Sequence, residues 1–190
     1  MTSERQMKKL NVGCGDRKIH SFINVDIRED VHPDVVCDIS KISETFENVD
    51  LIYACHVLEH FPDKPFLNQR TTWRDVLVDW HKSLRKNGIL RISVPDLKVV
   101  CERYLKTGDL LEIKSFLYGG QKYDYDYHFY GWDFILLKSK LEEIGFTNVR
   151  IYDWRETEHS YVDDYSQAYL PHLRKSDGQL MSLNVEATKL

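Results

Sequence analysis

The chain has 190 residues, of which 42% are hydrophobic and 29% charged, and this fits one domain, residues 1–190, with a buried core. Its net charge of −4 argues against a broad basic surface for a phosphate backbone, so we expect no nucleic-acid partner. No apolar run approaches the roughly 18 residues of a membrane span, and the N-terminus lacks the apolar core of a signal peptide. We therefore expect a cytoplasmic protein without membrane contact.

The segment 10–27, LNVGCGDRKIHSFINVDI, predicts a strand that runs into a Gly-x-Gly turn and a second short strand that ends at Asp26. Gly13 and Gly15 lack Cβ atoms, which lets the backbone N–H groups of residues 13–15 approach a ligand closely. An acidic residue at the end of the second strand can accept hydrogen bonds from both hydroxyls of a ribose. The pattern indicates an α/β fold that holds an adenosyl cofactor.

Three further strands are predicted in order. The run VVCDI, 35–39, would bring Asp38 to an adenine amino group and Ile39 onto the ring. The run DLIYACHVLEHF, 50–61, reads as a buried fourth strand, because parallel strands covered on both faces are continuously apolar. After a helix, LRKNGILRISVPD predicts a fifth strand over 89–94, with Gly88 ending the helix and Pro95 stopping the strand.

Together these segments resemble the class I S-adenosylmethionine-dependent methyltransferases, most closely small members associated with polysaccharide biosynthesis. The resemblance covers nearly the whole chain, since GFTNVRIYDW (145–154) and MSLNVEATKL (181–190) look like the last two strands of that fold. It implies an α/β, Rossmann-like, seven-stranded sheet, mostly parallel with an antiparallel last strand, and S-adenosyl-L-methionine as cofactor. The expected cofactor contacts are Asn11, Gly13, Cys14, Gly15, Asp26, Ile27, Asp38, Ile39 and His56. Many members of the family carry an acidic residue where this chain has Asn11, and an amide offers no charge for the ammonium group of the cofactor.

The connections between the first strands are short. Seven residues separate Gly15 from Ile23 and seven separate Ile27 from Val35, whereas a helical crossover needs about 10–12 or more. The first helices are therefore expected to be shortened or absent. The predicted helices lie at about 70–86, 96–106, 109–117 and 133–144. One face of the sheet would be under-covered, and we expect the segment 96–132 or a second subunit, in a homodimer, to cover it.

Residues 116–132 contain eight aromatic side chains in 17 positions. We expect an insertion at about 96–132 on the acceptor side of the domain, because the carboxyl ends of parallel strands are where such folds bind ligands. Aromatic faces with polar neighbours suit a sugar or another flat, hydroxyl-rich acceptor. The expected acceptor contacts are Gln121, Tyr123, Asp126, Tyr130 and Trp132. The alternative is a structural role for this segment, as cover for the core or as a dimer contact.

Methyl transfer needs an aligned acceptor and, for a hydroxyl acceptor, removal of a proton. His128 is the first candidate for the base, because an unperturbed histidine titrates near neutral pH. Tyr127 and Asp126 are second candidates. His56, just past the fourth strand, is expected near the transferred methyl group.

The run HVLEH, 56–60, matches the H-x-x-E-H spacing of some zinc peptidases. That chemistry needs both histidines on one face of a helix, whereas here a strand precedes the motif and Pro62 follows it. The four cysteines show no C-x-x-C spacing, so we expect reduced thiols and no metal site.

The sequence thus predicts an S-adenosylmethionine-dependent methyltransferase that acts on a small-molecule or glycan-like acceptor, with O-methylation as the expected reaction. The alternative is a non-catalytic module that keeps the same fold and uses the aromatic segment for an interaction. A zinc hydrolase is the minor alternative. Methylation of nucleic acid or protein is disfavoured by the charge balance and by ACHV after the fourth strand, where an N-P-P-Y-like segment would serve amine acceptors.

Overall fold

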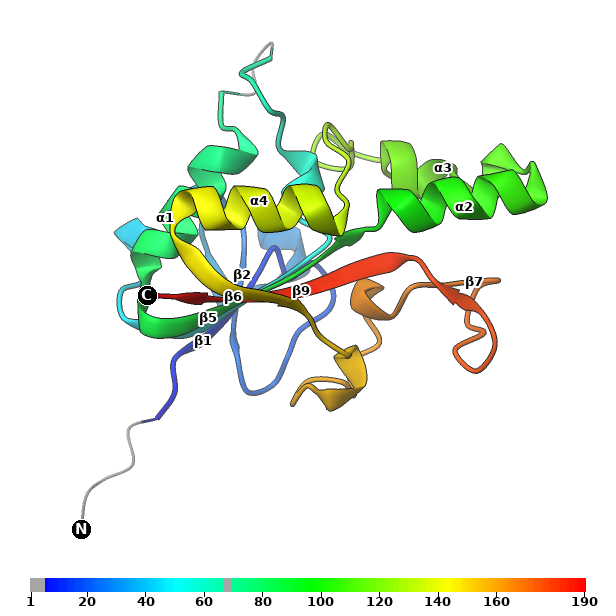
Figure 1. The fold of residues 1–190 in the computed structure, drawn as a ribbon. Helices are drawn as coiled ribbons and strands as arrows, with labels where there is room; N and C mark the ends of the chain where they lie inside the picture. Colours follow the sequence, from blue (N-terminus) through cyan, green and yellow to red (C-terminus); the bar gives the residue numbers. More distant parts are fainter. Residues whose placement is uncertain (1–5, 67–69) are drawn as a thin grey trace.

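The computed structural model describes residues 6–66 and 70–190 and contains a seven-stranded mixed sheet (Figure 1). The first five strands run parallel, and β9 is antiparallel to both of its neighbours. In sheet order the strands are β3 (Val35–Val36), β2 (Ile23–Asp26), β1 (Lys9–Val12), β4 (Val49–Cys55), β5 (Leu84–Pro95), β9 (Ser182–Lys189) and β6 (Phe146–Ile151). The predicted Rossmann-like sheet, mostly parallel with an antiparallel last strand, is confirmed.

The helices lie close to the positions that the sequence predicts. They are α1 (Trp73–Ser83), α2 (Leu97–Thr107), α3 (Leu110–Tyr118) and α4 (Phe134–Ile144). Between β1 and β3 the structure has only the short turn η1 (Glu29–Val31), and η2 (Ile39–Glu44) follows β3, so the first two crossovers lack α-helices as predicted. No helix among residues 6–66 and 70–190 is long and apolar enough to cross a membrane.

Gly88 does not end the helix before β5, which corrects the prediction from the sequence. Helix α1 ends at Ser83, and β5 begins at the next residue. Gly88 lies inside β5, beside an irregularity in the pairing with β4. A Cβ atom on Gly88 would lie 2.8 Å from the carbonyl oxygen of Arg85 and 3.0 Å from that of Val49. The glycine therefore permits a close backbone approach within a bulged strand.

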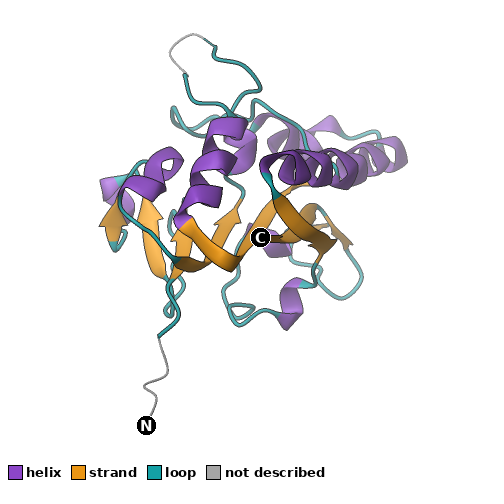
Figure 2. Ribbon diagram, turned by 60° about the vertical axis from the view of Figure 1, so that its left-hand side comes forward, coloured by secondary structure: helices purple, strands orange, loops and turns teal. Residues whose placement is uncertain are grey.

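Helices α1 and α4 lie together on one face of the sheet (Figures 1 and 2). Their buried side chains, including Leu77, Trp80 and Leu137, join the main apolar core with the inward residues of β1, β4, β5 and β9. The capping box of Thr72 and Asp75 fixes the start of α1. Burial of one face of these helices against the sheet is what holds the domain together.

The opposite face of the sheet is covered by residues 16–22 and 152–168, not by the segment 96–132. Tyr53 of β4 donates a hydrogen bond of 2.7 Å from its hydroxyl to Oδ2 of Asp164. The ring of His159 lies 4.2 Å from that of Tyr53 and 5.5 Å from that of Phe22, measured between centroids. The expectation for 96–132 is therefore wrong, and a second subunit is not required to cover this face.

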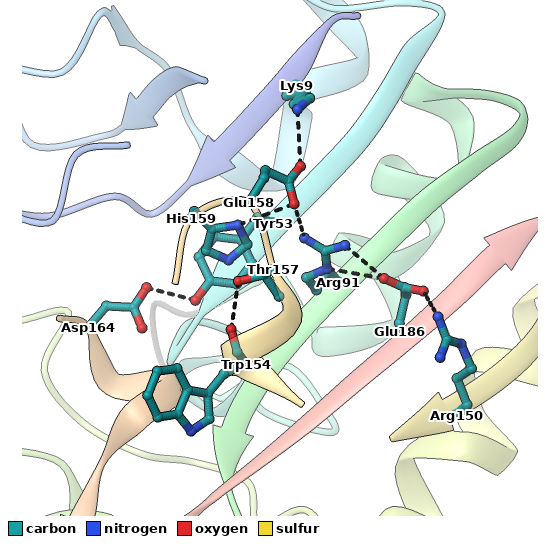
Figure 3. A network of polar contacts seen from close by, with 10 residues as sticks. All are labelled: Lys9, Tyr53, Arg91, Arg150, Trp154, Thr157, Glu158, His159, Asp164 and Glu186. Atoms are coloured by element: carbon teal, nitrogen blue, oxygen red, sulfur yellow. Dashed lines mark hydrogen bonds and ion pairs between the residues drawn. The ribbon is translucent and has the colours of Figure 1, made fainter. Parts of the chain in front are cut away.

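A network of charged side chains ties this covering segment to the sheet (Figure 3). Arg91 of β5 donates to Oε2 of Glu158 at 2.9 Å and to Oε2 of Glu186 at 2.9 Å, and Lys9 of β1 pairs with Oε1 of Glu158 at 3.0 Å. Burial opposes the ionisation of Glu158, but the hydrogen bonds from Arg91 and Lys9 prevail and lower the pKa of its carboxyl to about 2.

The segment 96–132 leaves the sheet after β5, and its two ends lie side by side. The backbones of Asp96 and Trp132 form a parallel bridge, and the N–H of Leu97 donates to the carbonyl of Trp132 at 2.9 Å. Between these ends, α2 and α3 lie side by side and pack with Leu170 and Met181 in a small apolar cluster (Figure 1).

Candidate functional site

A cavity of about 760 Å³ opens where β1, β2 and β4 end. These strands are parallel, so the residues that follow them meet at one edge of the sheet. The residues that line the cavity are Gly13, Gly15, Asp26, Ile27, Arg28, Asp38, Ile39, Ser40, His56, Val57, His60, Phe61, Phe66, Thr71, Tyr123, Asp124, Tyr125, Tyr127 and Phe129.

The glycine turn and Asp26 form one end of the cavity. Gly13 and Gly15 both have positive φ, +65° and +48°. A Cβ on Gly15 would have no heavy atom within 4 Å, so no protein group obstructs the approach of a ligand to this backbone. The N–H of Gly15 donates to Oδ2 of Asp26 at 2.8 Å, and the N–H of Arg28 donates to Oδ1 at 2.9 Å. Each carboxylate oxygen keeps further acceptor capacity for a ligand hydroxyl.

Asp38 and Ile39, expected as adenine contacts, line the cavity together with Ser40. Oδ1 of Asp38 accepts from the N–H of Ser40 at 2.9 Å and from its hydroxyl at 2.7 Å. This fixes the carboxylate at the start of η2.

Asn11 and Cys14, expected as cofactor contacts, do not line the cavity. Nδ2 of Asn11 donates to the carbonyl of Arg17 at 2.9 Å and to Oδ1 of Asn24 at 3.0 Å, so the side chain holds the glycine turn against β2. Cys14 is buried, which raises the pKa of its thiol to about 12. Its backbone N–H donates to the carbonyl of Val25 at 3.1 Å, within the strand pairing instead of toward the cavity.

His56 follows β4 and lines the cavity in a left-handed backbone conformation, with φ of 53°. Its Nε2 lies 2.9 Å from Oγ of Ser182, and that hydroxyl donates its own proton to the carbonyl of Tyr165 at 2.6 Å. Nε2 of His56 must therefore carry the proton that Ser182 accepts, and Nδ1, 3.4 Å from Oε1 of Glu59, has the lone pair. Burial and two neighbouring histidines lower the pKa of His56 to about 3.

Glu59 lies behind the cavity wall and is only 1% exposed. Its carbonyl accepts the N–H groups of Phe129 and Tyr130 at 2.8 and 3.2 Å, which attaches the aromatic segment to the turn η3 (Leu58–His60). Neither carboxyl oxygen of Glu59 has a hydrogen-bond partner in the described part of the chain. Burial raises the pKa of this carboxyl to about 8.

His60 and His128 meet at the same place. His60 lines the cavity and donates from Nδ1 to the carbonyl of Tyr127 at 2.9 Å, whereas His128 points behind the wall and donates from Nδ1 to the carbonyl of Phe116 at 3.1 Å. The two rings lie edge to face, with centroids 4.8 Å apart. Burial and the nearby His60 lower the pKa of His128 to about 4. The first candidate for the base is thus outside the cavity lining.

Tyr127 and Tyr123, from the aromatic segment 116–132, line the cavity with three neighbours: Asp124, Tyr125 and Phe129. Tyr123 lies over the guanidinium of Arg28, 4.5 Å from Cζ to the ring centroid. Arg28 follows β2, the strand that ends at Asp26. The contact between Tyr123 and Arg28 therefore joins the aromatic segment to the end of the cavity that carries Asp26.

The other expected acceptor contacts lie elsewhere. The carboxylate of Asp126 accepts the N–H groups of Gly120 and Lys122 at 3.1 and 3.2 Å and thereby shapes the loop. Gln121 is exposed, with φ of 55°. Tyr130 packs on Trp73, and Trp132 is 0% exposed in the main core, so the structure places these two aromatic rings with the core instead of the cavity lining. For Tyr130 and Trp132, the structure supports the alternative role as cover for the core.

Several lining residues escape the sequence analysis. Val57 packs against the glycine turn, since a Cβ on Gly13 would lie 2.6 Å from its Cγ2. Phe61 belongs to the run 50–61 that the sequence analysis reads as one strand, but β4 ends at Cys55 and the turn η3 follows. Phe66 and Thr71 come from a stretch with no regular pattern. The only signal for them is their place after the fourth strand, in the loop where such folds carry ligand contacts.

The H-x-x-E-H spacing does not give a peptidase site. The turn η3 has three residues, and Nε2 of His56 is bonded to Ser182. His56 and His60 therefore do not form a ligand pair on one helix face.

No protein-family model matches the sequence, and no curated protein matches it either. Solved structures do resemble the fold. A SAM-dependent methyltransferase from Archaeoglobus fulgidus superposes with a TM-score of 0.57 at 16% identity, over 97% of this chain and 87% of that chain. A SAM-dependent methyltransferase from Thermotoga maritima gives 0.57 at 12% identity, over 99% and 84%. The CurJ carbon methyltransferase gives 0.56 at 17% identity, over 99% of this chain and 50% of that chain. At these identities the similarity establishes the methyltransferase fold.

Proposed function

We propose that the protein is an S-adenosylmethionine-dependent methyltransferase acting on a small-molecule or glycan-like acceptor. One observation carries the proposal: Asp26, held by the N–H groups of Gly15 and Arg28, faces the same cavity as the bare glycine turn and Asp38. The fold neighbours are named as enzymes that use this cofactor.

The residues present fit the cofactor. Asp26 has acceptor capacity left for ribose hydroxyls, Asp38 and Ile39 offer an acceptor and an apolar face for adenine, and the backbone at Gly15 is unobstructed. The bound cofactor would supply an electrophilic methyl group on a sulfonium. The chain then has to hold an acceptor in line with that group and exclude water, and alignment of this kind contributes much of the rate.

The acceptor would lie against Tyr123, Tyr125, Tyr127 and Phe129. Aromatic faces beside Asp124 suit a polyhydroxyl ligand, whose C–H faces stack on rings while its hydroxyls bond to carboxylates. This composition supports O-methylation of a sugar-like molecule in polysaccharide chemistry. Removal of the hydroxyl proton would fall to Tyr127, which lines the cavity. The lone pairs of His56 and His128 both face Oε1 of Glu59, at 3.4 and 3.9 Å.

Calorimetric titration with S-adenosylmethionine and S-adenosylhomocysteine tests the cofactor site. We expect micromolar binding to the wild type and at least about tenfold weaker binding to Asp26→Ala, which loses the ribose contacts. Asp163→Ala is the matched control, because Asp163 is exposed and pairs with Lys175, and neither residue lines the cavity. Absence of binding to folded wild-type protein would refute the proposal.

Turnover separates the enzyme from a non-catalytic module of the same fold. The protein would be incubated with S-adenosylmethionine and a panel of sugars and phenols, and release of S-adenosylhomocysteine would be measured. Release with a hydroxyl acceptor supports O-methylation. Tight cofactor binding without release from any acceptor would favour the binding module.

A further inference from the structure

We propose that Glu59, His60 and His128 form a binding site for a divalent transition-metal ion of the zinc type, which fastens the aromatic segment to the turn η3. One ligand atom from each of the three side chains lies within 4.8 Å of the others. The site is distinct from the cofactor end of the cavity, and it borders the acceptor end through His60.

Both histidines are oriented as metal ligands are. Nδ1 of His60 faces the carbonyl of Tyr127 at 2.9 Å, and Nδ1 of His128 faces the carbonyl of Phe116 at 3.1 Å. A carbonyl oxygen can only accept, so each Nδ1 must carry a proton, and each neutral ring keeps its lone pair on Nε2. Metal-bound histidines almost always donate their other N–H in this way, which fixes the tautomer and the ring orientation.

The side chain of Glu59 provides the independent argument. It is 1% exposed, and neither oxygen of its carboxyl has a hydrogen-bond partner in the described part of the chain. Buried polar groups are normally hydrogen-bonded, and one that is not requires an explanation. Two imidazole nitrogens with lone pairs face Oε1 of Glu59: Nδ1 of His56 at 3.4 Å and Nε2 of His128 at 3.9 Å. An ionised carboxylate would meet only acceptors there, and a cation between Glu59 and His128 would satisfy both of these ligands.

The spacing needs only a small contraction. Ligands bound at roughly 2.0–2.2 Å in tetrahedral geometry lie about 3.3–3.6 Å from one another. The ligand atoms of the three side chains lie within 4.8 Å of one another, so a bound metal would draw them together by about 1 Å through side-chain rotation. Two imidazoles and a carboxylate suit zinc, and three protein ligands leave a fourth position for water.

The two sides of the site belong to different segments, which gives the metal a role. Glu59 and His60 belong to η3, and His128 belongs to the aromatic segment. The same segments are already joined by the N–H groups of Phe129 and Tyr130 on the carbonyl of Glu59. A metal bridge would lock the wall that carries Tyr127 and Phe129, and so rigidify the acceptor side of the cavity.

The inference departs from the expectation of no metal, and also from the H-x-x-E-H hydrolase alternative. That alternative would use His56 and His60 as ligands and Glu59 as a base. Here His56 is bonded to Ser182, and the third ligand comes from position 128, far along the chain. The H-x-x-E-H spacing taken alone would therefore name His56 as a ligand, whereas the structure brings His128 to the cluster.

Metal titration of the chelator-treated full chain tests the inference without cofactor or acceptor. We expect one equivalent of Zn²⁺ to bind in calorimetry and to raise the melting temperature, and Co²⁺ to give the visible absorption of a four-coordinate site. Since loss of even an outer-shell partner costs 10–100-fold in affinity, loss of a ligand in His128→Gln or Glu59→Gln should weaken Zn²⁺ binding at least about 100-fold.

His172→Gln is the matched control, because His172 is exposed, belongs to no cluster of ligands among the described residues, and should leave Zn²⁺ binding unchanged. Glu59→Gln keeps the shape of the side chain and guards against misfolding of the histidine variant, and circular dichroism would check both. Equal Zn²⁺ affinity in the wild type, Glu59→Gln and His128→Gln would overturn the inference. Because no methyl donor is present, that result would leave the proposed function standing.

Discussion

Oδ2 of Asp26 accepts a 2.8 Å hydrogen bond from the backbone N–H of Gly15, so the carboxylate at the end of β2 fixes the turn that follows β1. The residue expected to bind the ribose therefore also organises the backbone expected to approach the cofactor. The two glycines of this turn have different surroundings. Gly13 packs against Val57, whereas Gly15 faces open space in the cavity.

Alanine at these two positions should separate stability from binding. In Gly13→Ala, a Cβ 2.6 Å from Cγ2 of Val57 adds overpacking to the cost of a positive φ, so we expect a loss of about 2–4 kcal/mol in unfolding free energy. Gly15→Ala should lose only about 1–2 kcal/mol, from φ alone, but its methyl group would enter the cavity and weaken S-adenosylmethionine binding. Urea denaturation and calorimetry measure the two effects.

The variant Val57→Ala tests the cause of the first effect. Removal of the Val57 methyl groups should reduce the cost of Gly13→Ala, so the double variant should be more stable than the sum of the single changes predicts. Strict additivity would show that the contact with Val57 is not the source of the strain.

Some of the residues expected at the cofactor end line the cavity because their determinants are local, although Asn11 and Cys14 do not. Gly13, Gly15 and Asp26 lie within one strand, turn and strand, where spacing alone brings them together. The acceptor end depends on tertiary contacts. His128 and Tyr127 are neighbours in sequence, yet only Tyr127 lines the cavity, and aromatic content alone does not distinguish Tyr123 from the fully buried Trp132.

The cover on the second face of the sheet could not be predicted for a similar reason. Residues 152–168 contain no long helix or strand, so they lack the periodicity that indicates an amphipathic element. They cover the sheet through single long-range contacts, such as Asp164 with Tyr53 and Glu158 with Arg91. Contacts of this kind leave no pattern in a single sequence.

Replacement of Tyr123 should weaken cofactor binding modestly through Arg28. The guanidinium lies 4.5 Å from the ring centroid at a partly exposed site, where a cation–π contact contributes about 0.5–1 kcal/mol. We expect Tyr123→Leu to raise the Kd for S-adenosylmethionine about two- to fivefold, and Tyr123→Phe, which keeps the ring, to match the wild type. Equal loss in both variants would indicate that the hydroxyl is the important group.

The substitution Asn11→Asp would introduce the acidic residue expected from the resemblance, yet here it should destabilise the fold. Nδ2 of Asn11 donates to the carbonyl of Arg17 and to Oδ1 of Asn24, and an aspartate would place a buried carboxylate against two acceptors. We expect a loss of about 2–4 kcal/mol in urea denaturation. The exposed Asn148→Asp should change stability by less than about 0.5 kcal/mol. An unchanged midpoint for Asn11→Asp would contradict this role of the amide.

The stability of the domain should fall as His159 is forced to take up a proton. Its ring is 2% exposed and packs on Tyr53 and Phe22. Burial, followed by the charge of Arg91, lowers the pKa of His159 to about 4, although Asp164 and Glu158 act in the opposite direction. The ordinary pKa of 6.5 applies to the unfolded chain, so between pH 6.5 and about 4 the unfolded state binds more protons and stability drops as the pH falls.

His159→Phe keeps an aromatic ring in the same contacts and removes the titration. We expect the unfolding free energy of the wild type to fall by roughly 2–3 kcal/mol more than that of the variant between pH 7.5 and 4.5. Urea denaturation of both proteins across this range measures the difference, which cancels the contributions of other groups. Parallel curves for the two proteins would show that His159 does not titrate between the folded and unfolded states as its burial requires.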